Sequence, residues 1–388
     1  MIDIHQHRQQ FLGLKNKYYF NYGGQGILPQ SALQKIIDSY QYIDQVGPFG
    51  LKINGWIYEN IAATKKAIAQ EIGVTSNTIT LTENVTASCN IPLWGIDWQE
   101  GEEILLTDAE HPGIIAIVKE ISRRFGVKII TCPIIETLND GNPLEVIKNH
   151  LTSNTRLVII SHILWNTGQI LPLKEIVSVC HSYSDSKKQI QVLVDGAQSA
   201  GSLPLNLVES RVDFYGCTGH KWLCGASGVG FLYTRQDLIT SLSPTFIGWR
   251  GLNYSKTDLP FTDDGSRFEV ATSAYPLFTA LQEAIAIHQQ WGTIEQRYHR
   301  ISELSSYLWE ELTKIETIEC LKNTPPKSGL ISFYLRNGKD ANNMVKTLEE
   351  KGFYLRTLVN PYCIRACVHY LTLETEIEAL IQIIRNEN

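Results

Sequence analysis

The sequence predicts an α/β protein made of a large domain, with a mostly parallel sheet between helices, and a smaller α+β domain. From about residue 56 to about residue 255, short apolar segments alternate with helical patterns, as in βαβ units. The chain has 388 residues, which is too many for one small core. A polar, turn-rich segment then precedes a new series of helices and strands. We therefore expect a large domain at 21–255 and a small domain formed by 1–20 and 256–388.

Each element follows from its own pattern. Apolar residues at helical spacing predict helices in WIYENIAATKKAIAQEIG, ENVTASCNIPLWGI, GIIAIVKEISRRFG, PLEVIKNHL and LKEIVSVCHSY. Gly73 and Gly126 are expected to end the first and third of these helices. Strands are expected in TITL, EEILLTD, VKIITCP, TRLVIISHI, IQVLVDGAQ, VDFYGCTG and VGFLYT. In the small domain we expect a long helix from near Leu277, strands in GLISFYL, FYLRT and YCIRACVHY, and helices around ANNMVKTLEEKG and at the end of the chain.

Composition argues against several classes of protein. A net charge of -6 and a pI near 6.0 argue against nucleic-acid and anionic-membrane partners, which require a basic face. The apolar runs are too short to span a membrane, and the polar start lacks the apolar core of a signal peptide. The eight cysteines include no CxxC pair, so we expect free thiols, no metal and a cytoplasmic location, although Cys217 and Cys224 bracket His220.

Ligands of such sheets bind at the carboxyl ends of the strands, so polar residues that follow apolar segments are the candidates. Asp195 ends a strand pattern and Gln198 follows three residues later. A carboxylate there can stay ionised against a pyridinium nitrogen, or it can simply cap a helix or close a turn. Lys221 lies in a glycine-rich turn between two strand patterns. A desolvated lysine has a lowered pKa and can form a Schiff base, whereas a solvated loop lysine cannot do so readily.

Three further positions follow strand patterns or flank Lys221. Thr86, with the backbone N–H groups of the next helix that begin near Ala87, can hold a phosphate. Thr218 and His220 can donate hydrogen bonds to the same group. His111 can stack on a flat ring. A capped helix for Thr86 and an exposed loop for His111 are the alternatives, but one crevice at the strand ends can collect all of these residues.

The chain resembles the class V pyridoxal-phosphate (PLP) aminotransferases, and within them the cysteine desulfurase group. The resemblance extends from NYGGQGILP to the final helix, and VDGAQSAG followed by TGHKW is its most specific part. Asp195 and Lys221 are 26 positions apart there (221 − 195). The resemblance implies the PLP-dependent transferase fold of type I. It also implies that Lys221 is the Schiff-base lysine, Asp195 pairs with the ring nitrogen, Gln198 contacts the ring hydroxyl and His111 stacks on the ring.

The resemblance also implies contacts around the ring. Thr86, Thr218 and His220 would hold the phosphate, and Thr272 in RFEVATSAYP would reach the phosphate of a neighbouring subunit. The implied assembly is a homodimer with the active site at its interface. Arg365 in CIRACVHY would bind the α-carboxylate of an amino-acid substrate, because a guanidinium group matches a planar carboxylate in two hydrogen bonds.

Two departures from the family pattern are visible. Family members place an asparagine beside the cofactor, but an ungapped count from His162 puts Trp165 there, with Asn166 one residue later. Desulfurases carry a mobile loop with a persulfide-forming cysteine between two arginines. Arg356 and Arg365 are only nine positions apart (365 − 356), and the segment between them is too short for that loop.

Cys363 lies in the expected strand itself, so we expect it to be a buried core residue. These departures favour a PLP-dependent carbon–sulfur lyase, with Lys221 as general base for β-elimination. Cystine would give pyruvate, ammonia and cysteine persulfide, and cysteine would give pyruvate, ammonia and sulfide. A sulfur-acceptor protein, for example in iron–sulfur cluster assembly, would then receive the released sulfur. Arg356 can bind a second carboxylate. A desulfurase that forms alanine, another class V reaction such as epimerisation or transamination, and a scaffold protein remain alternatives.

Overall fold

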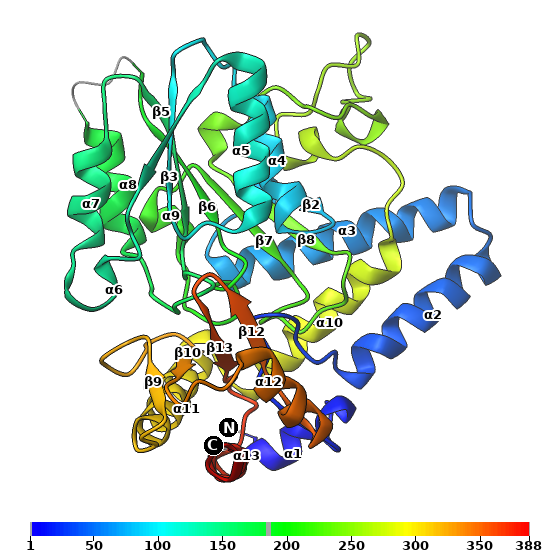
Figure 1. Cartoon of the computed structure of the whole chain (residues 1–388). Coiled ribbons are helices and arrows are strands. Elements are labelled where there is room, and N and C mark those ends of the chain that lie inside the picture. The colour runs from blue at the N-terminus through cyan, green and yellow to red at the C-terminus, as the bar shows by residue number, and fades with distance from the viewer. Residues whose placement is uncertain (1, 184–187, 388) are drawn as a thin grey trace.

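A computed structural model describes residues 2–183 and 188–387. It contains a large sheet with helices on both faces and a smaller sheet formed by the C-terminal part of the chain (Figure 1). The division into a large and a small α+β part agrees with the predicted fold class.

The described part of the large sheet has seven strands in the order β2-β8-β7-β6-β5-β3-β4. All run parallel except β8, which is antiparallel to both of its neighbours. Each strand overlaps one of the predicted segments: β2 Ile79–Thr82, β3 Glu103–Thr107, β4 Lys128–Cys132, β5 Thr155–Ser161, β6 Gln191–Asp195, β7 Phe214–Thr218 and β8 Gly230–Thr234.

The parallel strands alternate between two cores, one on each face of the sheet. Val158 and Ile160 of β5 face one core, and Leu157 and Ile159 face the other, as expected for strands covered on both sides. Gly73 and Gly126 end α3 and α5 in the left-handed conformation, as predicted. The helices around this sheet are α2 Gln30–Val46, α3 Leu51–Ile72, α4 Val85–Gly95, α5 Pro112–Phe125, α6 Thr137–Asp140, α7 Pro143–His150, α8 Leu173–Ser182, α9 Leu207–Ser210 and α10 Tyr275–Trp291.

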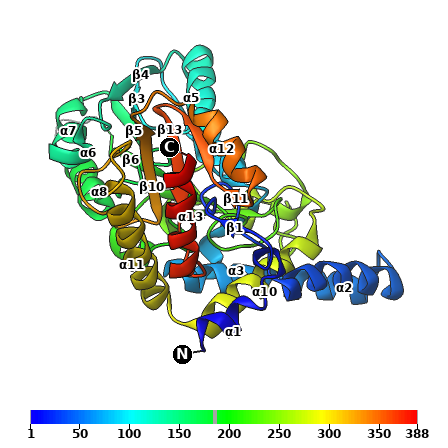
Figure 2. The ribbon, with the colours of Figure 1, turned by 60° about the horizontal axis from the view of Figure 1, so that its bottom comes forward.

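The small sheet is antiparallel, in the order β12-β13-β10-β9. Its helices pack on one face, where Ile364 and Ala366 of β13 enter a shared core (Figure 2). The opposite face turns toward the large domain: Ser332 and Arg365 donate hydrogen bonds to the carbonyl oxygens of Asn166 and Trp165. The elements are α11 Ile294–Thr313, β9 Ile318–Cys320, β10 Leu330–Leu335, α12 Ala341–Glu350, β11 Phe353–Tyr354, β12 Arg356–Val359, β13 Tyr362–Cys367 and α13 Glu374–Glu387.

The N-terminal segment joins the small domain through two contacts. Strand β1 (Tyr18–Tyr19) pairs in parallel with β11, and Arg8 at the end of α1 (Ile4–Arg8) forms an ion pair of 2.7 Å with Glu376 on α13. Helix α10 begins in the core of the large domain and ends beside Tyr370, so it belongs to neither domain alone. The exact domain boundaries therefore stay a prediction. No helix in the described ranges is long and apolar enough to cross a membrane.

Candidate active site

The carboxyl ends of the central strands bring the predicted lysine, carboxylate and histidine together. Asp195 ends β6, Lys221 follows β7 by three residues, and His111 follows β3 and begins α5. Burial lowers the pKa of Lys221 to about 8, against the opposing effect of Asp195, and Arg365 and Arg356 lower it further. Burial also lowers the pKa of His111, which Asp195 and Lys221 influence in opposite directions. These groups therefore share one electrostatic environment.

Asp195 is buried and held in place by the backbone. Its Oδ1 accepts a hydrogen bond of 2.9 Å from the Ala197 N–H, and its carbonyl oxygen accepts one of 3.1 Å from the His162 N–H. A second buried carboxyl group, Glu110, accepts from Ser161 and Thr107. Burial raises the pKa of Glu110 to about 7, and the charge of Asp195 adds to this effect. Glu110 was not among the predicted site residues, although its place directly before His111 was a signal.

The starts of α4 and α5 lie side by side at one end of the site. A Cβ atom on Gly113 would lie 3.3 Å from Thr86 Oγ1 and 3.3 Å from His111 Nδ1. The cap of α4 is Asn84, which accepts from the Ala87 N–H at 3.0 Å, so Thr86 is not needed as a cap. His111 caps α5 by accepting from the Gly113 N–H at 3.2 Å. Two adjacent helix starts with a hydroxyl group suit a phosphate.

Thr218 and His220 lie on the turn that carries Lys221. Thr218 is buried at the end of β7, and its Oγ1 lies 2.6 Å from His220 Nδ1. Gln198 is also buried: its Nε2 donates to the Gly23 carbonyl at 2.9 Å. A half-buried lysine of lowered pKa beside a carboxylate, a histidine and these polar groups fits a PLP cofactor.

Arg365 is buried without enough partners. Its side chain is 1% exposed, and Nη1 donates to the Trp165 carbonyl at 2.7 Å. Nε and Nη2 have no hydrogen-bond partner among the described residues. Arg356 lies directly opposite on β12, and its side chain makes no hydrogen bond or ion pair with a described residue. Burial and the charge of Arg365 lower the pKa of Arg356. Arg356 is exposed, whereas Arg365 is a buried charge without enough partners, which is costly, so the pair fits an anionic ligand.

The asparagine expected beside the cofactor is directed elsewhere. Asn166 Nδ2 donates to the Asn360 carbonyl at 3.1 Å, and its buried Oδ1 has no hydrogen-bond partner in the described chain. Trp165 lies beside His111 instead, edge to face, with 5.8 Å between the ring centroids. Its Nε1 donates to the Ala109 carbonyl at 3.1 Å. An indole ring therefore forms the wall of the site next to His111.

Cys363 lies within β13 and is 1% exposed, as predicted. Burial raises the pKa of its thiol to about 12. A buried thiol of high pKa stays protonated near neutral pH and is a poor nucleophile. The eight cysteines of the sequence are all free and buried in the structure, in agreement with the expected free thiols.

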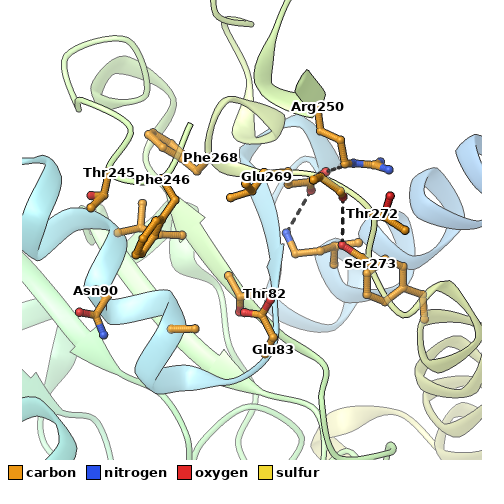
Figure 3. Close-up of a pocket in the computed structure, with 16 residues that line it drawn as sticks. Thr82, Glu83, Asn90, Thr245, Phe246, Arg250, Phe268, Glu269, Thr272 and Ser273 are labelled. Atoms are coloured by element: carbon orange, nitrogen blue, oxygen red, sulfur yellow. Dashed lines mark hydrogen bonds and ion pairs between the residues drawn. The ribbon is translucent and has the colours of Figure 1, made fainter. Parts of the chain in front are cut away.

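Thr272 lies on a separate cavity of about 660 Å³ (Figure 3). Its wall also includes Ala87 and Asn90 of α4, which connects it to the helix start at Thr86. Glu269 anchors the segment before Thr272 through an ion pair of 2.8 Å with Lys65. The remaining lining residues include Thr82, Glu83, Thr245, Phe246, Arg250, Phe268, Val270 and Ser273. Lys221 is not among the residues that line this cavity.

Known proteins share this fold and, in part, this sequence. Two solved structures of C-DES have a TM-score of 0.95 and 48% identity. One is a lysine-to-alanine mutant with glycine covalently linked to the PLP cofactor. The match covers 98% of this chain and 99% of the C-DES chain. The other, described as a complex of the cystine C–S lyase with its reaction product cysteine persulfide, covers 97% and 99%. The Escherichia coli cysteine desulfurase CsdA, at 21% identity and a TM-score of 0.86, covers 100% and 98% and shares the fold.

Curated relatives are more distant. A probable cysteine desulfurase of Halobacterium salinarum is 26% identical over 326 residues, which are 80% of this chain and 75% of that protein. The isopenicillin N epimerase of Streptomyces clavuligerus is 29% identical over 59% of this chain and 56% of its own. The family model described as aminotransferase class-V matches residues 18–383, and the chain therefore belongs to the class V aminotransferase family.

Proposed function

We propose that this chain is a PLP-dependent carbon–sulfur lyase that cleaves L-cystine by β-elimination into pyruvate, ammonia and cysteine persulfide. The observation that carries the proposal is the pair Arg356 and Arg365, two guanidinium groups on directly opposite residues that both lower the pKa of Lys221. The Nε and Nη2 groups of Arg365 have no partner among the described residues. Cystine has two carboxylates, whereas cysteine has one. The 48% identity with the cystine C–S lyase C-DES over nearly the whole chain supports the same substrate.

When bound, PLP supplies an electron sink for the electron pair left as the substrate loses its Cα proton. Lys221 would carry the cofactor, and Asp195 would hold the proton on the ring nitrogen. Thr86, Thr218 and His220 would bind the phosphate, with His111 against the ring.

Lys221 is suited to move the Cα proton. Its pKa of about 8 leaves a useful fraction of neutral amine near neutral pH, whereas an ordinary lysine is almost fully protonated there. Arg365 would bind the α-carboxylate next to the reacting carbon through the free Nε and Nη2 groups. Arg356 would bind the carboxylate of the distal half of cystine, so that the scissile Cβ–S bond lies between the two arginines and Lys221.

Elimination needs no thiol from the protein. The Cα–H and Cβ–S bonds break, the persulfide leaves with the bonding pair, and water completes the products as pyruvate and ammonia without any oxidant or reductant. A desulfurase that forms alanine instead needs a thiolate to take the sulfur. Cys363 is buried in a strand with a raised pKa and is unsuited to that role.

The proposal extends to the assembly. Thr272 is exposed in the single chain, on a cavity shared with the helix that carries Thr86. A homodimer in which the partner's copy of this segment completes the phosphate site would explain that placement. Transfer of the released persulfide to an acceptor protein, as in iron–sulfur cluster assembly, is part of the same proposal. Free thiols suit a reducing compartment such as the cytoplasm.

The test is to incubate the PLP-loaded enzyme with cystine and with cysteine separately and to measure pyruvate, ammonia, alanine and persulfide. We expect one pyruvate and one ammonia for each cystine consumed, and faster turnover of cystine than of cysteine at equal low concentration. Lys221→Ala, which removes the general base, should abolish pyruvate formation. Alanine as the main product would contradict the proposal and favour a desulfurase.

A further inference from the structure

Trp222, the residue after Lys221, is completely buried and makes a directed hydrogen bond. Its indole Nε1 donates to Gln198 Oε1 at 2.9 Å. Its ring lies beside Tyr22 and His369, with centroid distances of 6.4 Å and 5.9 Å, and these two rings stack on each other at 4.5 Å. Trp222 is therefore next in sequence to Lys221, the proposed cofactor lysine, and also contacts Gln198, which is expected at the ring hydroxyl of the cofactor.

This bond fixes which way the amide of Gln198 points. An indole N–H can only donate, so the group that faces Trp222 must be the amide oxygen. The amide nitrogen then faces the other way and donates one hydrogen to the Gly23 carbonyl at 2.9 Å. Its second hydrogen has no acceptor among the described residues. Gly23 lies against Arg365, because a Cβ atom there would be 3.0 Å from Nη2. The free N–H thus belongs to the substrate side of the site.

Two buried histidines hold the backbone on which Trp222 sits. His369 Nε2 lies 3.2 Å from the Trp222 carbonyl, and His288 Nε2 lies 3.0 Å from the Leu223 carbonyl. A carbonyl oxygen can only accept, so both Nε2 atoms carry a proton. Burial lowers the pKa of His369 to about 3 and that of His288 well below its usual value, so both rings are neutral over the working pH range.

The hydrogen bonds behind His288 all run in one direction. His288 Nδ1 must accept, and it lies 2.7 Å from the Tyr370 hydroxyl. That hydroxyl then accepts from His7 Nε2 at 3.1 Å, and His7 Nδ1 accepts from Gln10 Nε2 at 3.2 Å. This series of hydrogen bonds connects α1 and the small domain to the turn that carries Lys221. Each ring residue in the series donates one hydrogen bond and accepts another, so the roles are consistent throughout.

We propose that Trp222 is a positioning residue that orients the amide of Gln198 so that an N–H donates to the ring oxygen of the cofactor, with His369 holding the Trp222 peptide. The inference rests on the proposed function, because it needs a bound PLP. A hydrogen bond donated to the anionic ring oxygen stabilises its ionised form and lowers the pH at which the bound cofactor loses its proton.

The test is a pH titration of the visible absorbance of the bound cofactor. Trp222→Phe removes the N–H that holds the amide oxygen and leaves only the Gly23 carbonyl to orient the amide, so the hydrogen bond to the ring oxygen should weaken and the midpoint should rise by about one pH unit or more. Because loss of the large indole can destabilise the fold, a second variant replaces Trp222 with β-(3-benzothienyl)alanine, which keeps the ring shape and exchanges only N–H for sulfur. Gln198→Glu, which has no N–H to donate, should show the same upward shift.

His369 provides a matched pair of variants. His369→Gln keeps an N–H donor at the position of Nε2 and should leave the midpoint within about 0.3 pH units of the original, whereas His369→Leu should raise it. An unchanged midpoint in the benzothienylalanine protein with PLP bound would overturn the proposal, even if Gln198→Glu shifts it. The proposed function fails in a different way, through alanine as the main product from cystine or cysteine, or through the absence of visible cofactor absorbance in the unmodified protein.

Discussion

Arg356 and Arg365 are directly paired residues of the antiparallel strands β12 and β13, so two guanidinium groups share one cross-strand position. Like charges placed opposite each other destabilise a sheet. An anion with two carboxylates bound between the groups would offset this repulsion. Burial lowers the pKa of Arg356, and the charge of Arg365 adds to this effect.

Arg356→Gln should therefore affect cystine much more than cysteine. Loss of one charge-assisted hydrogen bond is expected to raise the KM for cystine by roughly 10- to 100-fold and the KM for cysteine by less than about threefold. Steady-state kinetics with both substrates measure the difference. Arg336→Gln, which removes an exposed ion pair with Glu319 on the same domain, is the matched control. Equal effects on both substrates would show that Arg356 does not bind a distal carboxylate.

Cys363→Ala should leave the reaction intact. Because the thiol is buried and has a raised pKa, we expect kcat for cystine to stay within about twofold, with a loss of about 1 kcal/mol in the free energy of unfolding from the small cavity. Cys320→Ala, another buried cysteine of the small domain, should behave in the same way. A collapse of sulfur release in Cys363→Ala alone, with PLP still bound, would favour a desulfurase mechanism.

Local signals were enough to predict most of the fold. Gly73 and Gly126 end their helices as expected because the left-handed residue that closes a helix favours glycine. Short apolar segments between helical patterns predicted all of the strands of the large sheet that the structure describes. Strand β8 is antiparallel because the turn that carries Lys221, rather than a helix, joins it to β7. This direction was not predicted.

The site was predictable only in part. Asp195 and Lys221 were found because each follows a strand, and strand ends converge in such a sheet. The contact of Arg365 with the Trp165 carbonyl depends on how the small sheet lies on the large one, and no local spacing encodes that arrangement. The hydrogen bonds of buried Glu110 to Ser161 depend on the neighbouring strand β5, which is distant in the sequence. The displacement of Asn166 toward Asn360 likewise required the tertiary structure.

The lowered pKa of Lys221 should make the stability of the apoprotein depend on pH. The folded lysine has a pKa of about 8, whereas the unfolded one titrates near 10.5. Between these values the unfolded state binds more protons, so the free energy of unfolding contributed by this residue rises with pH. Lys221→Met should be more stable than the original apoprotein below pH 8, and the gap should narrow as pH rises toward 10.5. Urea unfolding of both proteins across this range gives the comparison, and a constant gap would contradict it.

Thr272→Ala should weaken cofactor binding without changing the stability of the apoprotein, because the side chain is exposed in the single chain. Loss of one hydrogen bond to the phosphate is expected to raise the Kd of PLP by about tenfold. Ser273→Ala removes the neighbouring hydroxyl on the same cavity and should leave the Kd unchanged. Equilibrium dialysis of the two variants separates a specific contact from a general disturbance of the segment.

Mixed dimers decide whether Thr272 acts across the interface. A dimer of one Thr272→Ala subunit and one Lys221→Ala subunit would contain one complete site if Thr272 is supplied by the partner, because the intact Lys221 then meets the partner's intact threonine. If Thr272 served its own chain, every site of the mixed dimer would lack one of the two residues. We therefore expect mixing to restore tight PLP binding and turnover at one site per dimer, whereas no restoration in a mixture shown to contain heterodimers would exclude a phosphate contact from the partner.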